Sequence, residues 1–217
     1  MLARVRSAAV LGIDGYLVDV EADLANGLPS FATVGLAQGA VKEGRERVHA
    51  AIANAGYEVP LKRTTVNLAP ADIPKAGSGF DLPIAIAILV ASGQIPDAGL
   101  DDTLFIGELG LEGSLRPIRG AISIAIAARD AGIRRIVLPA ANAGEAAVVS
   151  IETLGAETLQ QVAGHLRGES RLVAASADPA ALLREPVSDG LDFSDVRGQP
   201  AAKRALEVAA AGGHNLL

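Results

Sequence analysis

The sequence predicts an α+β fold in which a mixed sheet and helices form a sandwich, followed by a linker and the first elements of a second domain. Three observations support this prediction. Residues 3–35 carry strand patterns separated by turn residues, which is typical of an antiparallel group. From Gln38 onward, helical patterns alternate with short apolar strands. The polar, proline-containing stretch Gly168–Gly190 then indicates a linker.

The first three strands are bounded by turns at Gly12–Gly15 and at residues 26–29. Along the second strand, apolar residues alternate with the carboxylates Asp19, Glu21 and Asp23, which favours a half-buried strand. The Asn-Gly pair within residues 26–29 permits positive φ angles, so we expect a hairpin-like turn between the second and third strands.

The period then changes to that of a helix between Gln38 and Ala55, with Gly56 placed to end it. Glu43 precedes Arg47 by four residues, which predicts an ion pair along the helix. Thr64–Leu68 is a strand, and a loop rich in glycine and proline follows it.

Leu82–Ala91 is apolar on every side, which predicts a fully buried helix with Asp81 as its cap. We expect the later elements in this order: a hairpin of Thr103–Gly107 with Ser114–Ile118, a buried Ala/Ile helix over Gly120–Ala131, a strand over Arg135–Leu138, helix, strand and helix signals within residues 143–167, and a short helical segment at Ala180–Arg184.

The composition excludes several classes of protein. Half of the 217 residues are hydrophobic and 20 % are charged, so the chain can form a core. The absence of cysteine excludes disulfides and thiolate metal sites, and the three histidines lack ligand spacing, so we expect no metal site. A net charge of −6 argues against a surface that is basic throughout. The most apolar segment, Gly79–Ser92, is too short to span a bilayer. We therefore expect a cytoplasmic protein without a membrane partner.

The last residues have the pattern that leads into a P-loop nucleotide-binding domain. Gln199-Pro200 predicts a helix start, and Gly212-Gly213 predicts its end. Asn215–Leu217 then begins an apolar run suited to a buried parallel strand. The phosphate-binding sequence G-x-x-x-x-G-K-[ST] is absent from the chain. We expect a truncated ATPase domain, without ATPase activity in this chain.

The loop between Asn67 and Asp81 carries the residues most suggestive of catalysis. It brings Lys75 and Ser78 close to a helix start, and a serine nucleophile needs a base within hydrogen-bonding reach. Free helix N–H groups could also bind an anion there. The structural alternative, which we favour, is that the glycines form a tight turn, Lys75 is solvated and Asp81 caps the helix.

Several longer motifs resemble the N-terminal domain of the ComM/YifB family of magnesium-chelatase-like AAA+ ATPases. The similarity covers nearly the whole chain apart from the linker, and its motifs are Val34-Gly35-Leu36, Ala40-Val41-Lys42-Glu43, Val66-Asn67-Leu68-Ala69-Pro70-Ala71-Asp72, Gly79-Phe80-Asp81-Leu82-Pro83-Ile84-Ala85, Gly107-Glu108-Leu109-Gly110-Leu111-Glu112-Gly113, Arg116-Pro117-Ile118-Arg119-Gly120, and Phe193-x-Asp195-Val196-x-Gly198-Gln199 with Gly212-Gly213-His214-Asn215-Leu216. The resemblance implies a Lon-protease-like fold, also called ribosomal protein S5 domain 2-like, over residues 1–168. A linker over residues 169–190 and the AAA+ start over residues 191–217 would follow.

Lon-type peptidases use a Ser–Lys dyad, and this sequence departs from it at both positions. Gly79 stands at the place of the serine, with Ser78 one residue earlier, and Ile122 stands at the place of the lysine. An aliphatic side chain exchanges no proton, so we expect no catalytic residue here. A peptidase that uses Ser78 with Lys75 instead remains an alternative.

The resemblance implies that the full-length protein is an ATP- and Mg²⁺-dependent motor that acts on DNA as a homo-oligomer, a hexameric ring. Family members are linked to branch migration in natural transformation. This domain would then be an accessory to the motor; the alternative is the ATPase subunit of a metal chelatase. The expected binding residues are Val196, Gly198 and Gln199 at the adenine edge, and Arg116, Arg119, Lys62 and Arg63 for DNA.

Overall fold

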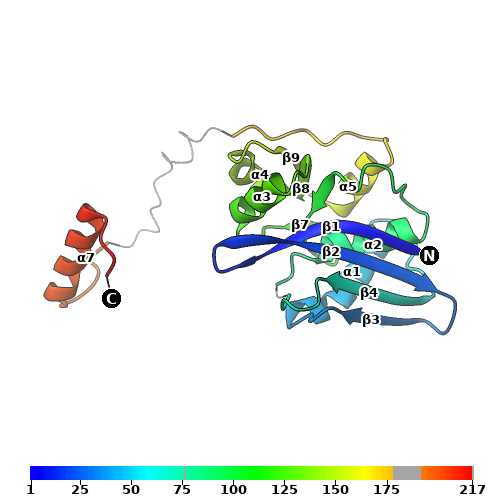
Figure 1. The fold of residues 1–217 in the computed structure, drawn as a ribbon, viewed down its shortest axis with the longest axis horizontal. Coiled ribbons are helices and arrows are strands. Elements are labelled where there is room, and N and C mark those ends of the chain that lie inside the picture. The colour runs from blue at the N-terminus through cyan, green and yellow to red at the C-terminus, as the bar shows by residue number, and fades with distance from the viewer. Residues whose placement is uncertain (76, 178–191, 217) are drawn as a thin grey trace. The chain divides into compact units, whose positions relative to one another are not determined.

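The computed structural model describes residues 1–75, 77–177 and 192–216, except for the side chain of Lys42. The chain divides into two compact units, Met1–Pro179 and Ala180–Leu217, and each is described by itself (Figure 1). The expected helical segment at Ala180–Arg184 lies outside the described residues.

The first unit contains a mixed seven-stranded sheet with the strand order β3-β4-β2-β1-β5-β8-β9. β1 pairs with β2 and β2 with β4 in antiparallel fashion, whereas the remaining neighbours are parallel. The strands are β1 Leu2–Leu11, β2 Asp14–Ala25, β3 Ser30–Val34, β4 Arg63–Ala69, β5 Thr103–Phe105, β8 Arg135–Pro139 and β9 Glu152–Ala156. The α+β class and the mixed sheet are therefore confirmed.

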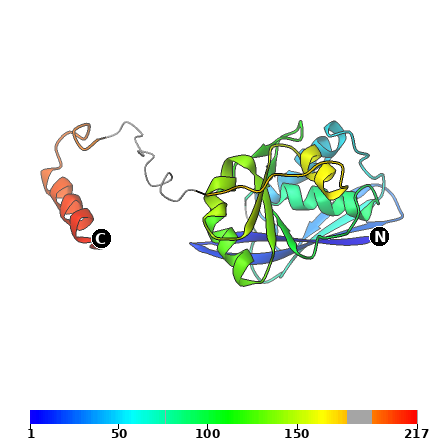
Figure 2. The same cartoon turned by 90° about the horizontal axis from the view of Figure 1, so that it is seen from above.

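Helices cover the two faces of this sheet unequally (Figures 1 and 2). Successive residues of a strand point to opposite faces, and in β1 Val5 joins one core cluster whereas Ala8 joins the other. The first cluster holds residues of α1 (Ala40–Asn54), α2 (Asp81–Ala91) and α5 (Leu159–Leu166), and the second holds residues of α3 (Ala121–Asp130) and α4 (Ala140–Ala147). The sheet is thus a central layer between two groups of helices.

The helix α2 is the centre of the larger cluster, since all of its residues are buried, as its composition predicts. Asp81, however, does not cap it. Phe80 occupies the N-cap position without a side-chain hydrogen bond, and Asp81 is the first helical residue. The expectation of an Asp81 cap is therefore wrong, because its carboxylate turns toward Arg47 of α1 instead.

Two expected strand pairings differ from the structure. The turn at residues 26–29 exists, but β4 lies between β2 and β3, so β3 pairs with β4 in parallel and not with β2 as a hairpin. The hairpin around Gly110 also exists, but β6 (Glu108–Leu109) and β7 (Leu115–Arg116) form it. Thr103–Phe105 joins the main sheet between β1 and β8. Packing between segments far apart in the chain determines these pairings, and the local turn residues do not encode them.

The helix α3 is buried along one face only. Ala121, Ile124, Ala125 and Ala128 pack against the sheet, whereas Ile122 and Ile126 are about 40 % exposed. The expectation of a buried helix therefore holds for one face only, because Ile122 and Ile126 on the outer side remain partly exposed.

The start of the expected linker lies against the sheet. Ala174 bridges to Leu154 of β9, and the Ala175 N–H donates to the Thr153 carbonyl at 2.8 Å. β9 is an edge strand with unpaired backbone groups, which explains why an extended segment binds along it.

In the second unit, α7 spans Pro200–Gly212 and ends at Gly213, whose φ of 62° is that of a left-handed C-cap, as expected. Asn215 and Leu216 form no strand with any described residue, because a strand needs a neighbouring strand to accept its hydrogen bonds. Among the described residues, no helix combines the length and apolar character needed to cross a membrane.

Candidate functional site

A cleft of about 360 Å³ lies where β1 ends, and five segments of the first unit line it. Its walls come from the end of β1, the loop before α2, the segment from Ile106 to Glu108, the loop after β7 and the helix α3. The lining residues include Ala8, Val10, Ser78, Gly79, Ile106, Glu108, Ile118, Arg119 and Ile124. Aliphatic side chains form most of the wall, and the polar groups are few.

Glu108 is the centre of the polar groups. The Ser78 hydroxyl donates a short hydrogen bond to its Oε2, and Arg116 Nη1 lies 3.6 Å from its Oε1. The Glu108 side chain is 26 % exposed. Both carboxylate oxygens are therefore engaged, and the negative charge of Glu108 is balanced within the protein.

Buried polar contacts hold both rims of the cleft. The side chain of Asn142, which is buried, accepts from the Ile118 N–H at 2.9 Å and donates to the Ile118 carbonyl at 3.0 Å. On the opposite rim, the Gly107 N–H donates to the Gly79 carbonyl at 2.8 Å. Since a buried amide is costly to leave unpaired, these bonds fix the loops and the cleft is formed in advance.

A buried ion pair supports the loop before α2. Arg47 of α1 donates from Nε to Asp81 Oδ2 at 2.7 Å and from Nη2 to Oδ1 at 3.2 Å. The Leu109 N–H also donates to Oδ2, at 3.3 Å. The expected helical pair of Glu43 with Arg47 is replaced by this longer-range pair. Arg47 pairs with Asp81 because the Asp81 carboxylate is only 1 % exposed, and a buried charge is costly without a cation beside it.

The two partners differ in how the pair changes their pKa values. Hydrogen bonding to Asp81 raises the pKa of Arg47, so the pair stabilises that charge. Burial raises the pKa of Asp81 above its usual range, although Arg47 and the Leu109 N–H act to lower it. The cost of burying the Asp81 carboxylate therefore dominates the contribution of this pair to stability. Asp81 is the more buried partner, and the desolvation of a carboxylate can exceed its Coulombic gain.

Lys75 is fully buried, so the expectation that it is solvated was wrong. Its Nζ has no hydrogen-bond partner within the described residues. Burial lowers the pKa of Lys75, and the carboxylate of Asp72 opposes this effect. Its backbone explains its place: Lys75 pairs with Ala37, and its carbonyl accepts from the Gln38 N–H at 2.9 Å.

The structure does not bring Ser78 and Lys75 together as a dyad. Ser78 bonds to Glu108, and Lys75 is not among the described residues that line the cleft. At Gly79, a Cβ would lie 3.1 Å from Cδ1 of Ile106, so the space that a serine side chain would need is already tight. Ile122 lies on the partly exposed side of α3.

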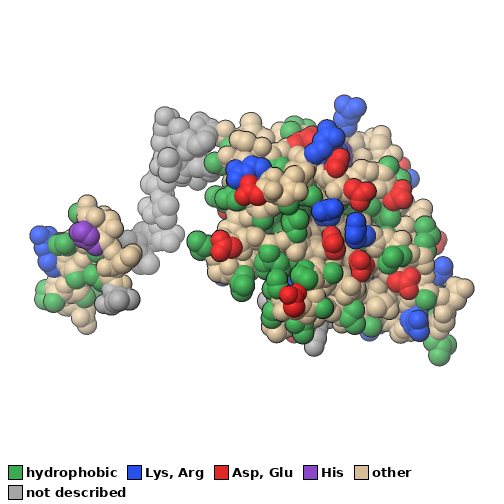
Figure 3. All heavy atoms as spheres, viewed as in Figure 1, with side chains coloured by type: hydrophobic (Ala, Val, Ile, Leu, Met, Phe, Trp, Pro, Cys, Tyr) green, Lys and Arg blue, Asp and Glu red, His purple; other side chains and the backbone are tan. Residues whose placement is uncertain are grey.

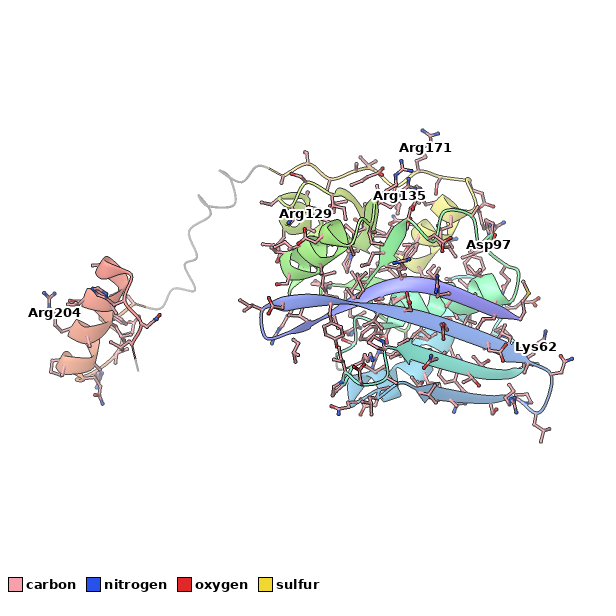
Figure 4. All side chains as sticks on the ribbon, viewed as in Figure 1. Lys62, Asp97, Arg129, Arg135, Arg171 and Arg204 are labelled. Carbon is pink, nitrogen blue, oxygen red and sulfur yellow. The ribbon has the colours of Figure 1, made fainter. Side chains whose placement is uncertain are left out.

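The four residues expected at a DNA interface fall into two separate pairs. Arg63 pairs with Ala25 at the end of the sheet where β1 begins, whereas Arg119 lines the same cleft as Val10, where β1 ends. Eight residues of strand separate these ends, which is about 25 Å at 3.3 Å per residue. Figure 4 shows Lys62 extending from the end nearest the N-terminus. On the face in Figure 3, basic and acidic side chains lie side by side.

The residues expected at the adenine edge form the turn before α7. Gly198 and Gln199 both have positive φ, 71° and 56°, and Gln199 is the N-cap without a side-chain hydrogen bond. The Lys203 ammonium donates to the Val196 carbonyl, and the Val196 residue is 45 % exposed.

The comparisons with known proteins define the class first. A family profile described as "Subunit ChlI of Mg-chelatase" matches residues 20–142, and one described as "Magnesium chelatase, subunit ChlI" matches residues 192–217. Over its whole length, the chain is 45 % identical to the uncharacterized protein YifB of Salmonella typhimurium and 44 % identical to the competence protein ComM of Haemophilus influenzae. The chain belongs to the ComM/YifB family of magnesium-chelatase-like proteins.

The chain spans only 42 % and 43 % of the lengths of those two relatives. A more distant similarity, 27 % over 184 residues, links 76 % of the chain to 23 % of the peroxisomal Lon protease homolog 2 of Caenorhabditis elegans. This identity is lower than the identities to YifB and ComM, and the aligned region leaves out about a quarter of the chain.

Sequence reasoning missed two residues that build the cleft. Glu108 follows the apolar strand β5 by three residues, and a lone carboxylate at that place was a usable signal. Asn142 lies in an alanine-rich helix, and no local pattern indicates that its amide reaches Ile118, 24 residues away in the chain.

Proposed function

We propose that this chain is the N-terminal accessory part of an ATP-dependent AAA+ DNA motor of the ComM type, followed by the start of the motor domain. The observation that carries the proposal is the 44–45 % identity to YifB and ComM proteins over the entire chain. The limits would be 1–168 for the accessory domain, 169–190 for the linker and 191–217 for the start of the ATPase domain. We propose that the full-length protein binds ATP and Mg²⁺ and assembles into a hexameric ring.

For the accessory domain, we propose the Lon-protease-like, ribosomal protein S5 domain 2-like fold without Lon chemistry. The similarity to the Lon homolog supports the fold. The glycine at position 79, the isoleucine at position 122 and the bond between Ser78 and Glu108 support the absence of a Ser–Lys dyad. The helicase or branch-migration activity would depend on the ATPase part of the protein.

Lys62 and Arg63 are the better candidates for DNA contact by this domain. Both are exposed, and neither forms an ion pair with any described residue. In the other pair, Arg119 is also exposed and without a described ion pair, but Arg116 is opposed by Glu108 at 3.6 Å, so that pair offers only one basic group without a described acidic partner. In a ring, each subunit repeats the pair, so that two basic groups become a belt of positive charge.

Salt-dependent binding of the 217-residue chain to labelled single-stranded and forked DNA tests this proposal. The variants are Lys62→Ala/Arg63→Ala and Arg116→Ala/Arg119→Ala. The control, Arg129→Ala/Arg134→Ala, removes the same charge from exposed arginines that lie beside Asp130 and Asp102. We expect the first variant to lose most of the affinity and to lower the salt slope by about 1.4 on single strands. Equal losses in all three variants, or affinity that salt does not change, would contradict DNA contact by Lys62 and Arg63.

The names of the matching profiles favour one alternative, the ATPase subunit of a metal chelatase. The stimulus of ATP hydrolysis in the full-length protein separates the two functions. Stimulation by DNA supports the motor, and stimulation only by a tetrapyrrole with its metal-inserting partner supports the chelatase.

A further inference from the structure

The cleft beside Ser78 has the dimensions of a ligand site, and DNA contact at Lys62 and Arg63 makes no use of it. Its volume of about 360 Å³ lies at the lower end of the range for small ligand pockets. Ala8, Val10, Ile106, Ile118 and Ile124 provide an aliphatic lining. A pocket of this size and lining fits one apolar side chain with a few backbone atoms.

The free charge of the cleft is positive. Glu108 is already satisfied by Ser78 and Arg116. Arg119 lines the cleft, is exposed, and forms no ion pair with any residue in the described parts of the chain. A guanidinium matches a carboxylate in geometry and charge and binds it through two parallel hydrogen bonds.

Ser78 adds a specific acceptor. Because its only hydroxyl proton is directed to Glu108, the lone pairs of Ser78 Oγ remain available for a ligand N–H. The cleft therefore offers an aliphatic surface, a hydrogen-bond acceptor and a guanidinium. The complementary ligand carries an aliphatic group, an amide N–H and a carboxylate close together.

The last residue of a peptide chain carries these three groups on one unit. We infer that the cleft binds the C-terminal residue of a peptide whose final side chain is aliphatic, with its carboxylate on Arg119, its amide N–H on Ser78 and its side chain against the aliphatic lining. A phosphate would match Arg119 but would leave that lining without a partner. The rims fixed by Asn142 and Gly107 reduce the cost of ordering the site on binding.

The test uses the peptide acetyl-Ala-Ala-Leu with a free carboxylate, and the same peptide as its C-terminal amide. Titration into the isotope-labelled 217-residue chain is followed by NMR chemical shifts. We expect saturable shifts at Ser78, Glu108 and Arg119. The amide should bind with an affinity about 10-fold lower than that of the free acid, because it lacks the charge-assisted pair. Arg119→Gln should lower affinity for the free acid by a similar factor, and Ser78→Ala by a few-fold.

Arg134→Gln, which removes another exposed arginine, is the matched control and should bind like the unchanged chain. Three outcomes would overturn the inference: no saturable shift at millimolar peptide, equal affinity for acid and amide, or full affinity in Arg119→Gln. Cleft shifts produced by a single-stranded oligonucleotide but not by the peptide would also overturn it and assign Arg119 to DNA. The DNA experiment with Lys62 and Arg63 is read separately, so either proposal can fail alone.

Discussion

Replacing Arg47 by methionine would leave the carboxylate of Asp81 buried without its cation. Asp81 is 1 % exposed and Arg47 is 23 % exposed. The change removes hydrogen bonds of 2.7 and 3.2 Å to Asp81 and one of 2.9 Å to the Ala40 carbonyl. Among the residues that the structure describes, only the Leu109 N–H, at 3.3 Å, would still donate to the carboxylate.

Breaking a buried ion pair in this way costs about 3–5 kcal/mol. We expect about 3 kcal/mol for Arg47→Met, because the arginine that is removed is itself partly exposed. In a unit of this size, that corresponds to a decrease in Tm of about 6–12 °C. Urea unfolding followed by circular dichroism measures the free energy, and Arg134→Met in the exposed pair with Asp102 is the control, with an expected loss of about 0–1 kcal/mol.

The double variant Arg47→Met/Asp81→Asn separates the charge from the packing. It buries no ion, so it should recover most of the stability that Arg47→Met loses.

The pH dependence of stability gives a second readout. Without Arg47, the pKa of Asp81 in the folded protein rises further above its unfolded value, so the folded state binds the proton more readily. The stability deficit of Arg47→Met is therefore full above that raised pKa and shrinks as the pH falls through it. A loss below about 1 kcal/mol, or a double variant as unstable as the single one, would refute this reasoning.

Two further substitutions test the backbone and the core. Gly35→Ala would place a Cβ 2.1 Å from the Leu68 carbonyl oxygen at φ 92°, so it should cost at least about 2 kcal/mol more than Gly56→Ala, where φ is 86° but the space is open; equal thermal shifts would contradict this. Lys75→Met should leave stability at neutral pH unchanged or higher, since it removes an amine without a described partner. The lowered pKa of Lys75 means that unfolding takes up a proton, so the original chain gains stability as the pH rises toward about 10, and the variant should lack this gain.

The periodic elements were predictable because their signal is local. The helix α2 is apolar on all sides, and its burial follows directly from that composition. The helix α7 is bounded by Pro200 and Gly213, whose backbone preferences act within one turn. The distant motifs around Asp72, Phe80 and Gly107 identified the family, which the comparisons confirmed.

The candidate site was less predictable, because contacts across long stretches of chain determine it. Ser78 was singled out with Lys75, three residues away, but it bonds to Glu108, 30 residues away. Arg47 was assigned to Glu43 on the same helix, but it bonds to Asp81, 34 residues away. In both cases, the side chain bonds to a buried or partly buried carboxylate that the fold places next to it, and not to the candidate partner nearest in sequence.

By itself, the sequence determined the α+β class and most of the element positions, because these depend on composition, periodicity and turn residues; its longer motifs determined the family. Only the tertiary structure decided that β4 separates β2 from β3, that Lys75 is buried, and that Ser78, Glu108 and Arg119 line one cleft. The physical reason is that strand pairing and the burial of charge are settled by which surfaces pack together. That choice minimises the exposed apolar area and the unpaired polar groups of the whole domain, so no local segment encodes it.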